Sequence, residues 1–235
     1  MDTPTKLKMN DLGYFETRGL NILVFNNWYD SYFSDAKTSG IELIHHETRT
    51  VTNGDLRLNP TPGQWDPVPH LVNRAVDIAQ GKVEVTLAYP DHDFTYQIKV
   101  EAQDEGVLIS LHLDKPVPLA LEDRDGFNLE FLPSAYFHKA YLMDEHSYLF
   151  PRYPRGPMVA LPDGTLEPGA IAQGSSLVAA PEDPARRVCV QARQGILLLY
   201  DGRNTAQNGW FVLRSPLPCG QAGKVIEWYL SASTI

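Results

Sequence analysis

The chain has 235 residues, a formal net charge of −9 at neutral pH, and hydrophobic side chains at 43% of its positions. This acidic balance argues against nucleic acid as a partner, because phosphate binding requires clustered Lys and Arg. No run of about eighteen apolar residues occurs, so the sequence predicts no membrane span and no membrane partner. The N-terminal residues MDTPTKLKMNDLGYFE lack the apolar stretch of a secretory signal peptide, which indicates a cytoplasmic protein or an excised fragment.

The first quarter of the chain contains short apolar segments separated by polar ones. Residues 1–12 precede these segments and are expected to form a flexible N-terminal extension. Asn21–Phe25 and Gly40–His45 predict strands, the first apolar enough to be buried on both faces. Val51–Leu58 predicts a hairpin, because Asn53-Gly54 supplies the positive φ that a two-residue turn requires.

The remaining chain alternates apolar and polar residues with the period of a β-strand. His70–Gln80 fits either a single helical turn or a strand, and residues 152–175, rich in Pro, Gly and Ala, predict a long crossover or loop. The segment 126–157 combines many Tyr and Phe with prolines, and predicts short strands joined by rigid aromatic loops. Further strands are predicted at Lys82–Tyr89, Phe94–Ala102, Val107–Leu113, Phe127–Phe131, Ser176–Ala180, Arg187–Ala192, Gly195–Asp201, Trp210–Arg214 and Lys224–Leu230.

These segments together predict an all-β fold with about fifteen strands. A single open sheet of that size would twist out of shape, so a large two-sheet β-sandwich accounts for them best. The absence of a break in composition favours a single domain over residues 1–235. The preferred topology is a supersandwich similar to galactose-mutarotase-like domains, with a jelly roll or two smaller sandwiches as the alternatives.

Two pairs of residues are weak candidates for a metal site, and no cofactor is predicted. His45 and His46 are adjacent on a strand, so their side chains point to opposite faces and cannot easily share one ion. Asp91 and Asp93 lie in a turn whose spacing is compatible with calcium, although a simple Asx turn explains them better.

The two cysteines, Cys189 and Cys219, are either a disulfide or two separate thiols. In the chain-entropy account, a disulfide that closes a loop of about thirty residues stabilises the fold by roughly 3–4 kcal/mol. The sequence leaves both alternatives open, with separate thiols as the simpler one.

Glu130 is the most interesting acid for catalysis, because it lies in an apolar strand where burial raises a carboxyl pKa. A glycosidase requires two such carboxylates across a cleft, and Asp144, Glu145 and Asp201 are the other acids considered. The simpler interpretation is that Glu130 lies on a solvated outer face of its strand. The chain contains no Ser-His-Asp spacing, P-loop, CxxC or HExxH motif.

Aromatic side chains in loops are the remaining positive signal, since Tyr and Trp stack on sugar rings and also dock neighbouring domains. The alternative is that each cluster anchors its loop to the core. The candidates for a glycan-facing or domain-facing surface are Trp28, Tyr29, Trp65, Tyr136, Phe137, Tyr141 and Trp210.

Four segments resemble parts of one protein family. They are NILVFNNWYDSYFSDAKTSGIELIHH, TNGDLRLNPTPGQWDPVP, GFNLEFLPSAYF and DGRNTAQNGWFVLRSPLP. They are similar to the N-terminal, non-catalytic β-rich region of large bacterial glycoside hydrolases of family 9. The resemblance implies that an immunoglobulin-like module and an (α/α)6 catalytic module follow in the parent protein. The catalytic Asp-Ala-Gly-Asp motif of that family is absent from this chain, so no catalytic residue is carried over.

The sequence allows three functional hypotheses, of which only the first is implied by the resemblance. The first is an accessory domain of a polysaccharide-degrading glycoside hydrolase, non-catalytic by itself, in a parent protein that is periplasmic or extracellular. Its partners are a polysaccharide or oligosaccharide and the downstream modules. The second is a free-standing lyase, epimerase or hydrolase that uses Glu130 with His45 or His46 as acid and base. The third is a purely structural interaction module.

Overall fold

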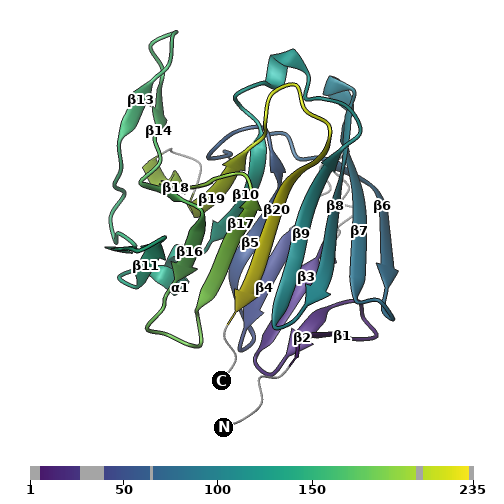
Figure 1. Ribbon diagram of the computed structural model, residues 1–235. Helices are drawn as coiled ribbons and strands as arrows, with labels where there is room; N and C mark the ends of the chain where they lie inside the picture. Colours follow the sequence, from purple (N-terminus) through teal and green to yellow (C-terminus); the bar gives the residue numbers. More distant parts are fainter. Residues whose placement is uncertain (1–5, 27–39, 64–65, 205–208, 233–235) are drawn as a thin grey trace, which may run out of the picture.

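The computed structural model describes residues 6–26, 40–63, 66–204 and 209–232. In this part of the chain, two large antiparallel sheets pack face to face as a β-sandwich (Figure 1). The predicted all-β sandwich is therefore confirmed. Their buried side chains form one hydrophobic core cluster between the sheets, rather than the separate cores that two smaller sandwiches would have.

One sheet, called sheet A, contains most of the N-terminal strands. Its strands, in spatial order, are β1 (Lys8–Met9), β2 (Phe15–Thr17), β3 (Leu20–Val24), β4 (Ile41–His45), β5 (Thr48–Arg57), β10 (Gly126–Phe131), β19 (Phe211–Pro216), β18 (Leu197–Asp201) and β15 (Ala172–Gly174).

The second sheet, called sheet B, contains as consecutive neighbours the three strands predicted at Lys82–Tyr89, Phe94–Ala102 and Val107–Leu113. Its strands, in spatial order, are β12 (His146–Leu149), β11 (Ala140–Met143), β16 (Ser176–Ala179), β17 (Val188–Gln194), β20 (Gly223–Ala232), β9 (Gly106–Leu113), β8 (Phe94–Gln103), β7 (Lys82–Tyr89) and β6 (His70–Asp77). His70–Gln80, which fitted a helical turn or a strand, is thus mainly strand.

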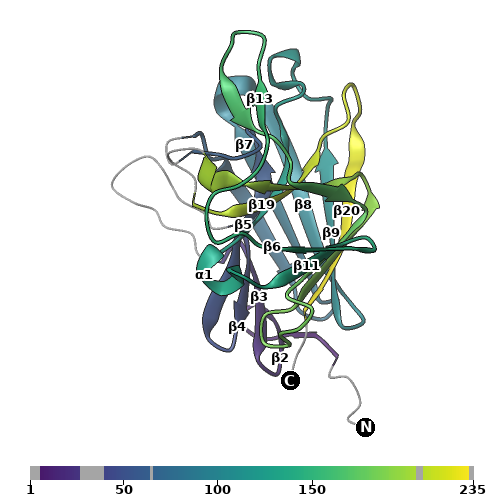
Figure 2. The same cartoon turned by 90° about the vertical axis from the view of Figure 1, so that its left-hand side faces the viewer.

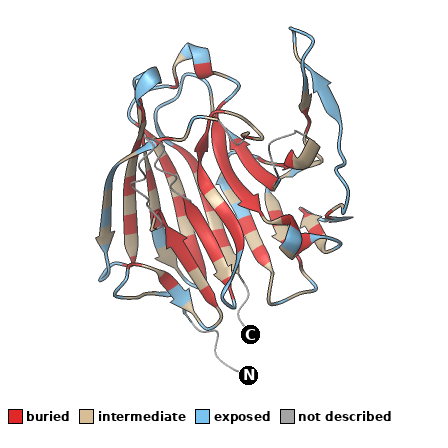
Figure 3. Cartoon of the chain, turned by 180° about the vertical axis from the view of Figure 1, so that it is seen from behind, coloured by how far each residue is buried: buried red, intermediate tan, exposed pale blue. Residues whose placement is uncertain are grey.

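The remaining elements are short. The helix α1 (Pro133–Tyr136) follows β10, and 3-10 turns cover Pro90–His92, Leu119–Leu121 and Gly202–Asn204. Strands β13 (Met158–Ala160) and β14 (Leu166–Pro168) form a hairpin inside the segment predicted as a crossover or loop. Figures 1 and 2 show this hairpin standing away from both sheets, and Figure 3 shows that most of it is exposed.

Alternation explains how the two sheets share their core. Val83, Val85 and Leu87 on β7 are fully buried, while the residues between them are partly exposed, as the period-two pattern predicts. Trp228 on β20 links the sheets, because its ring packs edge-on against Phe127 at a centroid distance of 4.9 Å. Figure 3 accordingly shows buried and partly exposed residues alternating along the central strands of sheet B.

Two sequence predictions need correction near the N-terminus. Residues 1–12 do not form a flexible extension throughout, because Leu7 is buried in the core and Lys8–Met9 pair with β2 as β1. Val51–Leu58 is not a hairpin either, since β5 runs through it without a turn. Asn53 does have the predicted positive φ, of 53°, but there the register with β10 shifts, as in a β-bulge.

The bulge explains why a glycine follows Asn53. An ideal Cβ on Gly54 would lie 2.6 Å from the Cβ of Ile41 on the neighbouring strand. A side chain at position 54 would therefore push β4 and β5 apart. The Asn-Gly pair was read as a turn because turns and bulges both place this dipeptide where the chain needs positive φ and little bulk.

Candidate functional site

The predicted aromatic surface is only partly at the surface. Trp28, Tyr29 and Trp65 lie outside the described residues. Tyr136 is fully buried, so the prediction that it faces a glycan or another domain is wrong. Its ring packs on Phe131 and Phe150 at centroid distances of 5.2 and 5.5 Å, and its hydroxyl donates to the carbonyl of Arg186 at 3.0 Å. Tyr136 therefore anchors its loop to the core.

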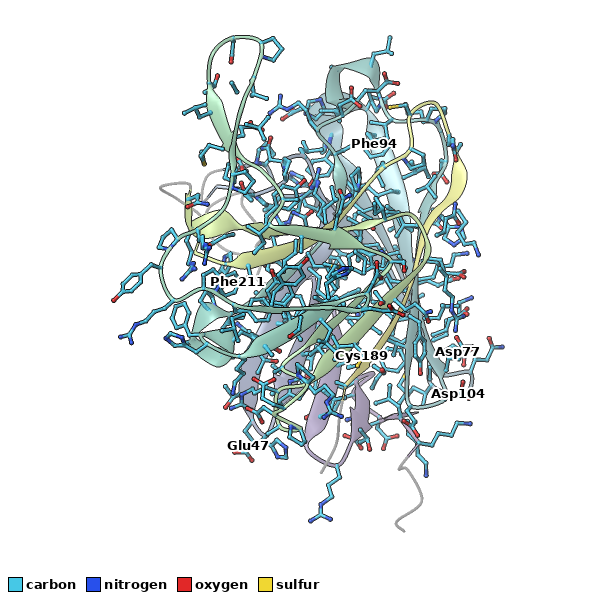
Figure 4. The ribbon with its side chains drawn as sticks, turned by 60° about the vertical axis from the view of Figure 1, so that its left-hand side comes forward. Glu47, Asp77, Phe94, Asp104, Cys189 and Phe211 are labelled. Atoms are coloured by element: carbon cyan, nitrogen blue, oxygen red, sulfur yellow. The ribbon has the colours of Figure 1, made fainter. Side chains whose placement is uncertain are left out.

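Phe137 and Trp210 are less deeply buried. Phe137 is 39% exposed, and its ring packs edge-on against Phe211 at 6.4 Å. Trp210, directly before β19, is half-buried. The label in Figure 4 shows Phe211 on the side of the molecule that carries the β13–β14 hairpin. Because Phe137 packs on Phe211, it also lies on the side of the molecule that carries the hairpin.

Tyr141 leads to a pocket on that side. The pocket has a volume of about 770 Å³ and lies where the edge strands of sheet B meet the chain just before β15, the edge of sheet A. We call it the Tyr141 pocket. It is lined by Tyr141, Tyr148, Leu149, Pro151, Arg155, Gly156, Pro157, Ala170 and Ile171.

Two tyrosines form one wall of the Tyr141 pocket. Tyr141 on β11 and Tyr148 on β12 are direct cross-strand partners, and their rings stack at 5.2 Å with an interplanar angle of 20°. Tyr141 is buried and joins the core, whereas Tyr148 is 42% exposed. Burial raises the pKa of Tyr141 to about 12, so its hydroxyl stays neutral at physiological pH. The predicted exposed surface at Tyr141 is therefore provided by its partner Tyr148.

Another part of the lining comes from the segment Pro151–Pro157, called the proline loop, of which Pro151, Arg155, Gly156 and Pro157 line the pocket. A buried carboxylate, Asp201, holds this loop: its Oδ2 accepts from the backbone N–H of Arg155 at 2.9 Å. The guanidinium of Arg203 donates to both oxygens of Asp201 at 2.8 Å, and also to the carbonyls of Pro151 and Arg152 at 2.7 and 2.8 Å. This ion pair, called the Asp201–Arg203 clamp, fixes both halves of the loop.

Two aromatic rings pack against the Arg203 side of the clamp. The guanidinium of Arg203 lies 4.6 Å from the ring centroid of Phe211 and 5.2 Å from that of Phe137. Cation–π contacts of this kind hold a guanidinium in a fixed plane. Asp201, considered from the sequence as a catalytic acid, is thus fully occupied in positioning the proline loop.

Gly156 closes the loop against the base of the hairpin. Its φ is +145°, and an ideal Cβ at this position would lie 2.7 Å from a methyl group of Ile171. A larger residue would separate the proline loop from the chain just before β15. Glycine is therefore required for the shape of the Tyr141 pocket.

Glu130 lies elsewhere, on the face of sheet A that points away from the core. Its neighbours Leu129 and Phe131 are in the core, so alternation turns Glu130 outward, but it is only 2% exposed. The predicted outward orientation holds, and the predicted solvation is wrong. Burial raises the pKa of this carboxyl, while nearby Arg57 and a hydrogen bond from Asn53, 2.6 Å long, act in the opposite direction.

A test of this arrangement uses Asn53. Asn53→Ala should lower the free energy of unfolding by about 2 kcal/mol, because a buried carboxylate loses its donor and Ala is strained at positive φ. Asn53→Gly tolerates the backbone conformation and should cost about 1 kcal/mol, which reports the hydrogen bond alone. Urea denaturation measures both values. Wild-type stability in Asn53→Gly would mean that Glu130 does not depend on this donor.

The structure does not bring the predicted acid–base pair together. His45 lies on the same face of β4 as the core residues Leu43 and Ile41, and therefore on the opposite face of sheet A from Glu130. Its Nδ1 lies 2.7 Å from Thr50 Oγ1, and burial, followed by nearby Arg186, lowers its pKa to about 4. His45 therefore behaves as a buried structural histidine.

His46 is also remote from Glu130. It is exposed in the turn between β4 and β5, next to Glu47. Figure 4 shows Glu47 at the end of the molecule away from the β13–β14 hairpin, and so away from the Tyr141 pocket. In this turn, the side chain of His46 is therefore not placed to act together with Glu130 or Asp201.

The metal candidates are explained by local structure. Asp93 is exposed at positive φ after the turn Pro90–His92 and forms an ion pair with Lys115 at 2.6 Å, while Asp91 is exposed. Among the described residues, no three His, Cys, Asp or Glu side chains are grouped as metal ligands.

No helix in this part of the chain is long and apolar enough to cross a membrane. Cys189 and Cys219 are separate free thiols, as in the simpler alternative.

Sequence reasoning missed Tyr148, Arg155 and the role of Asp201. A signal for the first two existed in the segment SYLFPRYPRGP, where prolines limit the backbone around exposed Tyr and Arg. Asp201 forms an ion pair with nearby Arg203, but the proline loop that this pair holds lies about fifty residues earlier in the chain, so no local signal showed this role. Comparison with models of known protein families gives no match for this sequence, and comparison with curated proteins gives none either.

Proposed function

We propose that this chain is a carbohydrate-binding accessory domain that does not cleave glycans itself. In this proposal, the parent protein is a glycoside hydrolase that acts in the periplasm or outside the cell, and its catalytic module is a partner of this domain. The observation that carries the proposal is the Tyr141 pocket, with its stacked pair of tyrosines. Aromatic faces bind the apolar faces of pyranose rings, and proline-fixed walls keep the entropic cost of binding low.

The geometry supports binding better than catalysis. Arg155 is the only charged residue among the described residues that line the Tyr141 pocket, so the pair of carboxylates that a glycosidase requires is not part of this lining. Glu130 and Asp201 lie on opposite faces of sheet A, because Glu130 pairs with Val212 while Asp201 pairs with the core residue Phe211.

The first test is binding of the purified domain to soluble β-glucan, xyloglucan, chito-oligosaccharides and insoluble cellulose, with released reducing sugar followed in the same samples. We expect retention on at least one glycan without release. Release by the wild type would overturn the non-catalytic assignment. Absence of both would favour the structural interaction module, for which the hairpin with exposed Met158, Val159 and Leu166 is the natural contact.

Tyr148→Ala should weaken glycan binding at least tenfold, because it removes the exposed half of the stacked pair. The matched control is Tyr229→Ala on β20, which removes a partly exposed tyrosine that contacts Arg193 at 5.2 Å and does not line the pocket. Titration calorimetry measures both variants against the glycan that the wild type binds. Equal loss in both variants would contradict a site at the Tyr141 pocket.

A further inference from the structure

The charge of the Tyr141 pocket differs from that of the whole molecule. The chain has a net charge of −9, yet Arg155 is the only charged residue among the described residues of the pocket lining. Within the described part of the chain, its guanidinium forms no ion pair or hydrogen bond, whereas Arg203 is neutralised by Asp201. The pocket therefore presents an unneutralised cation beside an aromatic wall.

The backbone of Arg155 is held in place although its side chain is unpaired. The Asp201–Arg203 clamp binds the N–H of Arg155 and the carbonyls of Pro151 and Arg152. In addition, Pro154 directly precedes Arg155, and Pro157 lies two residues after it. A ligand at this position meets a guanidinium whose loop is already ordered. Preorganisation of this kind increases affinity because less conformational freedom is lost on binding.

We propose that the Tyr141 pocket recognises an acidic sugar, a uronic acid residue of a glycan, and that Arg155 binds its carboxylate. This inference rests on the proposed function and adds the class of ligand. The guanidinium is a planar fork of donors that matches a carboxylate in two parallel hydrogen bonds. The stacked rings of Tyr141 and Tyr148 contact the sugar ring to which that carboxylate is attached.

Two matched pairs of probes test the inference. The first pair is a galacturonic acid trimer and its fully methyl-esterified form, and the second is xylotriose with and without one glucuronic acid branch. Titration calorimetry at low salt should show at least tenfold tighter binding of the acidic member of one pair. Raising the salt concentration should weaken binding of the acidic probe far more than that of the neutral one, because screening acts on charge pairs.

Arg155→Gln should reduce this preference to less than threefold, while the neutral probe keeps its wild-type affinity within about threefold. Arg155→Lys, which keeps the charge and loses the fork, should retain an intermediate preference. Arg152→Gln is the matched control: it makes the same charge change on the proline loop, but Arg152 lies over the ring of Tyr153 and does not line the pocket. In this control, the ratio of the affinities for the acidic and the neutral probe should stay at least half of the wild-type ratio.

The outcomes separate the two proposals. Equal affinity for acidic and neutral probes would overturn the inference and leave the accessory-domain proposal standing. A preference for the acidic probe that persists in Arg155→Gln would also overturn it, because another residue would then bind the carboxylate. Failure of every probe and every neutral glycan to bind would overturn the proposed function itself. Thermal unfolding of each variant, expected at the wild-type midpoint because position 155 is exposed, excludes misfolding as the cause.

Discussion

Asp201→Asn should lower the free energy of unfolding by about 3–5 kcal/mol, the range found when one partner of a buried ion pair is removed. Asp201 is fully buried, and its two oxygens accept from the backbone N–H groups of Arg155 and Arg203 and from the guanidinium of Arg203. An amide at this position offers a single acceptor oxygen and turns two donors toward other donors. The variant also leaves the charge of Arg203, whose side chain is only 11% exposed, without its counterion.

The same substitution should impair the Tyr141 pocket. Without Asp201, the proline loop loses the hydrogen bond at Arg155, and Arg203 loses the partner that orients it toward the carbonyls of Pro151 and Arg152. Glycan affinity should therefore fall at least tenfold at temperatures where the variant is still folded. Urea denaturation and titration calorimetry measure the two effects.

Asp183→Asn is the matched control for burial. Its ion pair with Lys139 is as short, at 2.6 Å, but the two side chains are 28% and 27% exposed. Exposed pairs contribute little, so this variant should lose about 1 kcal/mol or less and keep its glycan affinity. A loss in Asp201→Asn no larger than in this control would show that the clamp does not stabilise the fold.

Local sequence patterns predicted the strands, and they failed where the answer depended on distant parts of the chain. The meander of β7, β8 and β9 was predictable because buried and partly exposed residues alternate along most of each strand. Glu130 was assigned to a solvated face because alternation gives the direction of a side chain and not what covers it. Tyr136 was assigned to the surface because the rings that bury it come from other parts of the chain. They are Phe131 on β10 and Phe150, the residue that follows β12.

The candidate site was less predictable than the fold. The Tyr141 pocket combines a strand pair, the proline loop and the chain before β15, and the carboxylate that holds the loop comes from β18. Only the folded chain brings these segments together. The described parts of the four segments that resemble family 9 hydrolases lie mainly on sheet A and its connecting loops. The resemblance and the pocket are therefore separate arguments for a carbohydrate-associated function, and each can fail without the other.

His45→Gln should change how stability depends on pH. The pKa of His45 is lowered to about 4 from 6.5, mainly by burial, with Arg186 and His46 acting in the same direction and Asp183 against them. A lowered histidine pKa means that the folded state resists protonation. The stabilisation is then complete above pH 6.5 and is lost as the pH falls toward 4. At about 1.4 kcal/mol for each pKa unit, the loss amounts to about 3 kcal/mol.

Buried carboxylates oppose this trend in the wild type. Burial raises the pKa of Asp55 and of Asp125 to about 6 from 3.8, so their contribution to stability is present at low pH and is lost as the pH rises through 6. Both groups are present in the wild type and in His45→Gln. Their contributions therefore cancel in the difference between the two proteins, which isolates the histidine.

The measurement is urea denaturation of both proteins at pH 4, 5, 6 and 7 and constant ionic strength. The unfolding free energy of the wild type minus that of His45→Gln should fall by about 3 kcal/mol between pH 7 and pH 4. A constant difference would mean that His45 is protonated as easily in the folded chain as in the unfolded one. The buried position of this ring, with Nε2 lacking a hydrogen-bond partner among the described residues, argues for the opposite result.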